Sequence, residues 1–273
     1  MEPAVKSVAL PNEVRIPYVE QGNPAGIPVV LLHGFADSWR SFQLVLSHLP
    51  EFIHALAPTQ RGHGDASHPG EGYRVTDFAS DVAAFLDAVR VSKAVIVGHS
   101  MGSAVALRFA IDHPDRTMGV VVVGAAPGLH GTEAARTFWE SALAKMTDPV
   151  DSTLVRQMTE TSLAKPVPRA FLEAMTEDGV MVPAFVWKAA MQSRWRLEGD
   201  FSTELGSIHA PTLIVWGDRD VRYSRAAQEA LASAIAGSRL VVYEGAGHFA
   251  HWEEPDRFAA DLAGFVEKLG TLG

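Results

Sequence analysis

The sequence predicts an α/β fold in which a mostly parallel sheet carries helices on both faces. Two observations predict it: short apolar, β-branched runs recur along the chain, and amphipathic helical patterns separate them. Strands that are apolar on both sides belong inside a parallel sheet, where helices cover both faces. Alternation of such strands with helices indicates parallel pairing through right-handed crossover connections.

Each predicted strand is a run bounded by glycine, proline or polar residues. The six runs are 28–32, 53–57, 94–97, 119–123, 212–216 and 240–243. Apolar residues at steps of three and four predict helices over 78–89 and 258–269, each with one stripe that faces the sheet. Small and apolar residues after Ser100 predict a third helix, through Phe109.

The alternation stops between about residues 127 and 205. This stretch is rich in large apolar side chains, and Pro166, Pro168 and Pro183 indicate breaks between helices. We therefore expect a core domain formed by residues 1–126 and 206–273, with 127–205 as an inserted helical cap. We expect large side chains to line a substrate pocket against this cap. Periodicity does not show which of these side chains point into a cavity. The candidates are Trp39, Phe138, Trp139, Trp187 and Met191.

Composition excludes several classes of function. The chain has 273 residues, 47% of them hydrophobic, which is typical of a soluble protein with a sizeable core. A net charge of −9 argues against nucleic acid as a partner, and the lack of cysteine excludes disulfides, thiolate metal sites and a cysteine nucleophile. No apolar run is long enough to span a bilayer, and the first residues lack a signal-peptide pattern, so we expect a cytoplasmic protein. The expected partner is a small-molecule substrate, with no membrane, metal or organic cofactor; no pattern predicts the oligomeric state.

Ser100 is the candidate nucleophile. It stands in Gly98-His99-Ser100-Met101-Gly102, where a predicted strand turns directly into a helix. Such a sharp turn strains the central residue and requires small residues two positions away on each side, as Gly98 and Gly102 provide. The turn exposes the hydroxyl at a helix N-terminus, which favours developing negative charge.

A serine hydroxyl needs a base, and the base needs a carboxylate to orient it. His248 follows the last predicted strand in a loop with Gly245 and Gly247, where ligands bind beyond the carboxyl ends of parallel strands. His251 is the nearest rival, but it stands where the final helix should begin. Asp218 and Asp220 both follow the strand at 212–216, and the residues alone leave the choice open.

Five motifs together resemble those of the α/β-hydrolase superfamily across nearly the whole chain except the cap. They are His33-Gly34, Arg61-Gly62-His63-Gly64, the segment around Ser100, Trp216-Gly217-Asp218-Arg219-Asp220 and Gly245-Ala246-Gly247-His248. The resemblance implies an eight-stranded sheet, a nucleophile elbow and a triad in the order Ser100, Asp220, His248, with Asp218 bracing its loop. It also implies that the backbone N–H groups of Phe35 and Met101 form the oxyanion hole, and that His33 braces the loop before Phe35.

These residues predict a serine esterase that acts on a small, largely apolar carboxylic ester through an acyl-enzyme. Resemblance to epoxide hydrolases or haloalkane dehalogenases would require aspartate at position 100. Lactonases and carbon–carbon bond hydrolases keep the serine and remain open, although the latter often read Ser-x-Gly-Gly where this chain has Ser103. A ligand sensor that does not turn over is the alternative from another class.

Overall fold

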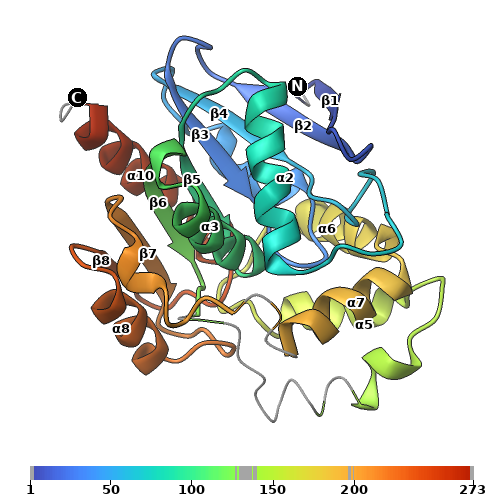
Figure 1. Ribbon diagram of the computed structural model, residues 1–273. Helices are drawn as coiled ribbons and strands as arrows, with labels where there is room; N and C mark the ends of the chain where they lie inside the picture. Colours follow the sequence, from blue (N-terminus) through green and yellow to red (C-terminus); the bar gives the residue numbers. More distant parts are fainter. Residues whose placement is uncertain are drawn as a thin grey trace.

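The structure, a computed structural model, describes residues 3–126, 128, 137, 140–195, 198 and 200–270. Its eight strands form one sheet in the order β1-β2-β4-β3-β5-β6-β7-β8 (Figure 1). The strands are β1 Val5–Ala9, β2 Arg15–Gln21, β3 Ile27–Leu32, β4 Ile53–Pro58, β5 Ala94–His99, β6 Thr117–Val123, β7 Thr212–Gly217 and β8 Arg239–Tyr243.

The sheet is mostly parallel, as predicted, because β3 to β8 all pair in parallel and only β1 and β2 pair antiparallel with their neighbours. The six predicted strands are confirmed within one or two residues at each end. The sequence pattern did not locate β1 and β2. Most of β1 is exposed, so it lacks an apolar run, and Pro17 interrupts β2 with a residue that has no N–H for the ladder.

Helices cover both faces of the sheet, and side chains alternate along each strand between the two faces. Val30, Leu32 and Ile96 point into the core under α2 and α3, whereas Val29, Leu31 and Val95 point into the core under α1 and α10. Figure 1 shows α2 and α3 side by side in front of the sheet. The helices are α1 Gln43–Leu46, α2 Val75–Ala88, α3 Met101–Asp112, α8 Arg225–Ala234, α9 Ala250–Glu253 and α10 Pro255–Gly270.

We call the helices with described bounds between β6 and β7 the inserted helices: α5 Ser152–Glu160, α6 Arg169–Met181 and α7 Ala184–Trp195. Pro168 precedes α6 directly and Pro183 precedes α7, as the sequence predicts. In Figure 1 these helices gather at one end of the sheet. Short 3-10 helices occupy Trp39–Phe42, Pro114–Arg116, Leu143–Lys145 and Leu205–Ser207. None of the helices in the described ranges is both long and apolar enough to cross a membrane.

Candidate active site

Ser100 lies at the sharp turn between β5 and α3 and has a backbone φ of +52°. This is strained for a residue with a side chain and persists only where the surroundings enforce it. Its N–H donates to the carbonyl of Val123 at the end of the neighbouring strand β6, at 2.9 Å. The neighbouring strand therefore helps to hold the strained turn in place.

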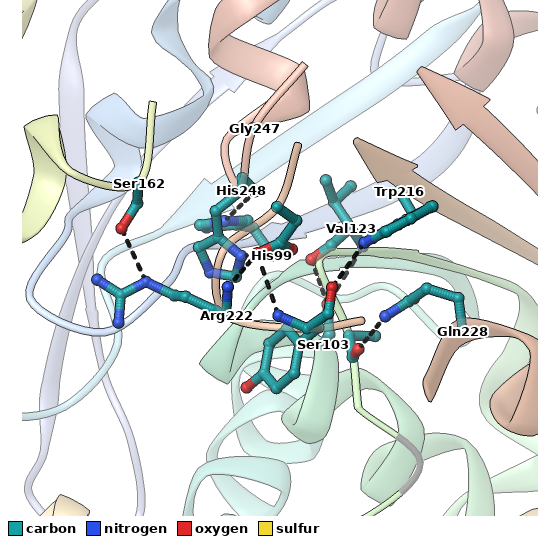
Figure 2. A network of polar contacts seen from close by, with 12 residues as sticks. His99, Ser103, Val123, Ser162, Trp216, Arg222, Gln228, Gly247 and His248 are labelled. Carbon is teal, nitrogen blue, oxygen red and sulfur yellow. Dashed lines mark hydrogen bonds and ion pairs between the residues drawn. The ribbon is translucent and has the colours of Figure 1, made fainter. Parts of the chain in front are cut away.

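Gly98 and Gly102 make the turn possible because they have no Cβ. A Cβ on Gly98 would lie 2.1 Å from the carbonyl oxygen of Gly102, and one on Gly102 would lie 2.2 Å from that of Leu32. Ser103 adds a clamp that sequence reasoning missed. Its hydroxyl donates to the Gly98 carbonyl at 2.7 Å and accepts from the Val123 N–H at 3.2 Å (Figure 2).

Asp220 and His248 meet in the space beyond β7 and β8. His248 Nδ1 lies 2.9 Å from Asp220 Oδ2, and the two side chains are 2% and 0% exposed. The other carboxylate oxygen, Oδ1, accepts the backbone N–H groups of Arg222 at 2.7 Å and Tyr223 at 3.2 Å. Asp218 instead accepts the N–H of Gly245 at 2.7 Å and so braces the histidine loop. The residues alone left open which aspartate pairs with the histidine, and in the structure the partner of His248 is Asp220.

The imidazole of His248 packs against the ring of His99, the residue before Ser100, and lies close to Gly124 at the end of β6. Its ring centroid lies 4.9 Å from that of His99, whose Nε2 is 3.2 Å from the His248 carbonyl oxygen (Figure 2). Gly124 follows the residue that accepts the Ser100 N–H, and a Cβ there would lie 2.9 Å from the His248 ring. Gly124 also has a φ of +56°. The space for the imidazole beside Ser100 thus depends on a glycine whose role sequence reasoning missed.

Behind this pair lies a buried polar layer. His251 has no exposed surface, its ring lies 4.5 Å from that of His99 at an interplanar angle of 44°, and its Nε2 is 3.3 Å from the Ser41 hydroxyl. Burial holds the pKa values of His99 and His251 well below their ordinary value, so both stay neutral. Burial also raises the pKa of Asp37, which accepts from Ser41, to about 8. His251, which the sequence offered as the rival base, therefore lies in this supporting layer.

The loop after β3 carries Phe35, the first of the two predicted oxyanion donors. This loop packs closely against the turn that holds Ser100, since a Cβ on Gly34 would lie 2.7 Å from His99 Nδ1. His33 braces it: its Nε2 accepts the N–H of Gln60 at 2.9 Å, and its carbonyl accepts from Gln60 Nε2 at 2.9 Å. The second predicted donor, Met101, is the first residue of α3, so its N–H has no acceptor within the helix.

A pocket with an empty volume of about 460 Å³, including its opening to solvent, lies between α2, α3, α7 and the loop after β3. The enclosed part of this space is only about 40 Å³, whereas about 300–1,000 Å³ is usual for ligand sites. The side chains of Phe35 and Met101 form part of its wall, and so link it to the serine turn. Its lining is Phe35, Tyr73, Val75, Phe78, Met101, Ala104, Val105, Ala190, Met191 and Ser193.

Of the five predicted pocket side chains, Met191 lines this pocket. Trp187 is buried behind the wall, with its ring 4.7 Å from that of Phe35. Trp39 requires a correction: it is buried in the core on the α1 and α10 face, because the turn at 39–42 directs it under the sheet. Phe138 and Trp139 lie outside the described residues.

The inserted helices attach directly to the loops that carry Asp220 and His248. The N–H of His248 donates to the carbonyl of Ser162, just after α5, at 2.9 Å. The hydroxyl of the same serine accepts from Arg222 Nε at 3.0 Å (Figure 2). On α6, Asp178 binds Arg40 Nη1 at 3.0 Å. One serine therefore contacts both the acid loop and the histidine loop.

Residues 27–255 match the family model of the alpha/beta hydrolase fold. The chain belongs to this family. It is 28% identical over 253 residues to the 2-hydroxymuconate semialdehyde hydrolase of Pseudomonas sp. strain CF600, covering 89% of this chain and 87% of that protein. Epoxide hydrolase A of Mycobacterium tuberculosis is 27% identical over 315 residues, at 94% and 96% coverage. A solved structure of Est816, described as an N-acyl homoserine lactone degrading enzyme, superposes with a TM-score of 0.79 at 28% identity and covers 95% of this chain and all of its own.

Proposed function

We propose that the protein is a serine hydrolase that cleaves a small, largely apolar carboxylic ester through an acyl-enzyme. The observation that carries the proposal is the buried pair of His248 and Asp220, with Nδ1 and Oδ2 2.9 Å apart, whose imidazole packs against His99 beside the strained Ser100. Nucleophile, oriented base and buried acid are the three groups that acyl transfer by serine requires. The fold family and the names of its relatives support the broader class, a hydrolase.

In the proposed mechanism, His248 accepts the proton of the Ser100 hydroxyl while its oxygen attacks the ester carbonyl. Asp220 holds the imidazole in the tautomer in which Nε2 carries no proton and can accept one, and stabilises the imidazolium that forms. The N–H groups of Phe35 and Met101 donate to the oxyanion, a contribution of about 3 kcal/mol for each donor. His248 then protonates the departing alcohol, and a water deprotonated by His248 hydrolyses the acyl-serine to release the acid.

The nucleophile separates this proposal from some relatives. An epoxide hydrolase of this fold would need aspartate as the nucleophile at position 100, and this chain has serine there. A lactone is the second candidate substrate, supported by the 28% identity to Est816, and it needs no change in the mechanism because a lactone is a cyclic ester. A carbon–carbon bond hydrolase is less favoured, since Ser103 serves as a clamp where Ser-x-Gly-Gly would have glycine.

The test is hydrolysis of p-nitrophenyl acetate and butyrate and of short-chain lactones by the wild type and by Ser100→Ala. Loss of the nucleophile should lower kcat by at least about 10³-fold, as in other serine hydrolases. Ser47→Ala, at an exposed serine directly after α1, is the matched control and should keep full activity. Many turnovers per molecule support an enzyme, and a halt near one turnover supports the sensor. Full activity of Ser100→Ala would refute the proposed mechanism.

A further inference from the structure

The pocket contains one polar group that nothing in the fold explains. Ser193, on α7, is 6% exposed, and its hydroxyl has no hydrogen-bond partner in the structure described. The side chain lines the pocket. Buried hydroxyls nearly always have a partner, because an unpaired one loses its hydration without compensation. A partner supplied by a bound molecule accounts for a free hydroxyl at this place.

The proposed mechanism indicates which part of an ester enters the pocket, so this inference rests on the proposed function. His248 protonates the departing alcohol, and the alcohol must therefore lie beside His248. Neither His248 nor Ser100 is part of the described pocket wall, whereas Phe35 and Met101 are. The pocket thus extends from the carbonyl-binding position away from the leaving group, in the direction of the acyl chain.

The lining sets the chemistry of that acyl chain. Apart from Ser193 and Tyr73, whose hydroxyl donates to the Pro69 carbonyl at 2.6 Å, the described lining is apolar. No described lining side chain carries a charge, so a carboxylate on the acyl chain would lose its hydration with no cation to compensate. A hydroxyl such as that of Ser193 both donates and accepts, and so suits an uncharged oxygen group.

We propose that this pocket binds an acyl chain that carries one uncharged oxygen group, either a keto or a hydroxyl group, and that the Ser193 hydroxyl forms a hydrogen bond with it. Recognition then has two parts. The aromatic and aliphatic wall takes the carbon chain by burial, and Ser193 distinguishes an oxygenated chain from its plain counterpart.

The test compares kcat/KM for pairs of p-nitrophenyl esters that differ by one oxygen: pentanoate with 4-oxopentanoate, hexanoate with 5-oxohexanoate, and heptanoate with 6-oxoheptanoate and with its 6-hydroxy analogue, which is too long to cyclise readily. For at least one pair the wild type should prefer the oxygenated ester by about three- to tenfold, the effect of a neutral hydrogen bond. Ser193→Ala should bring that ratio close to one and leave the plain ester within about twofold. Ser193→Thr, which keeps the hydroxyl, should restore the ratio.

Ser152→Ala, at an exposed serine on α5, is the matched control and should keep the wild-type ratio. Absence of any preference in the wild type, or a preference that survives in Ser193→Ala, would overturn the proposal. Calorimetric binding of the same pairs to Ser100→Ala, with and without Ser193→Ala, repeats the comparison without turnover. If no ester is cleaved but the affinities differ as expected, the proposed function fails and the pocket assignment stands; equal affinities refute the pocket assignment by themselves.

Discussion

The candidate site is formed by the loops that follow β3, β5, β7 and β8, which we call the strand-end loops, and by the inserted helix α7. The two regions hold their side chains in different ways. Asp220 accepts hydrogen bonds at both carboxylate oxygens, and Ser103 ties two strand ends together. On α7, Ala190 and Met191 contribute by packing, and Ser193 has a hydroxyl left without a partner. Directional bonds hold the groups proposed for the chemistry, and shape holds the groups proposed for selection. Loss of one atom should therefore matter far more in the loops than on α7.

The two aspartates beyond β7 test the first half of this contrast with the largest expected effect. Asp220→Asn should lower kcat for ester hydrolysis by about 10⁴-fold, because an amide no longer holds the tautomer that His248 needs. Asp218→Asn, the matched control, keeps an oxygen that accepts the Gly245 N–H and should stay within about tenfold of the wild type. Similar losses in both variants would mean that the hydrogen bond between Asp220 and His248 has no special role.

Gly124 tests whether the space beside Ser100 matters. Gly124→Ala places a Cβ 2.9 Å from the His248 ring and should lower kcat by about 10²-fold, the cost of a misplaced catalytic group. Gly237→Ala is a matched control, because its φ of +74° brings the same backbone strain with no atom within 4 Å. Both variants should lose about 1 kcal/mol of unfolding free energy in urea titrations, and only the first should lose activity. Normal kcat in Gly124→Ala would contradict the placement of His248.

Met191 tests the second half of the contrast, the role of packing on α7 in selecting the substrate. Met191→Ala enlarges the pocket and removes apolar contact, so kcat/KM for a hexanoate ester should fall by about tenfold while acetate changes little. Met181→Ala, at a residue 50% exposed, should leave the chain-length profile unchanged. A uniform loss with acetate and hexanoate would indicate damage to the strand-end loops rather than to the pocket.

The buried layer behind the site should give the smallest effect, and one that depends on pH. The folded-state pKa of Asp37 is raised to about 8, so the fold favours the protonated carboxyl. The unfolded chain releases this proton near pH 4, and the resulting stability is lost as pH rises through the folded value. Between pH 7 and 8 the unfolding free energy should fall by about 1 kcal/mol more in the wild type than in Asp37→Asn. Parallel stability curves for the two proteins would refute a protonated Asp37.

Below pH 6.5 the buried histidines act in the opposite sense. Burial lowers the pKa values of His33, His63, His99 and His251, so each stays neutral in the fold while the unfolded chain binds protons. Stability should therefore fall as pH decreases below the unfolded histidine value, in Asp37→Asn as in the wild type.

Local patterns could predict the central sheet and the candidate chemical groups, because both depend on short sequence segments. Ser100, Asp220 and His248 each follow a buried strand, and parallel strands bring their carboxyl ends to one edge. Gly124 and Ser103 were missed because their roles arise only when β5, β6 and the histidine loop meet. Ser193 and Trp39 show the same limit. Whether a side chain faces a pocket or the core depends on residues that are distant in the sequence, and local spacing does not identify those residues.

The most direct test of the central claim is covalent labelling with a fluorophosphonate, which reacts with serines that an adjacent base activates. Mass spectrometry of the digested wild type should find one added phosphonyl group on Ser100. Labelling should be absent in Ser100→Ala and should slow by orders of magnitude in His248→Ala. A label on another serine, or equal labelling rates with and without the imidazole, would contradict the account.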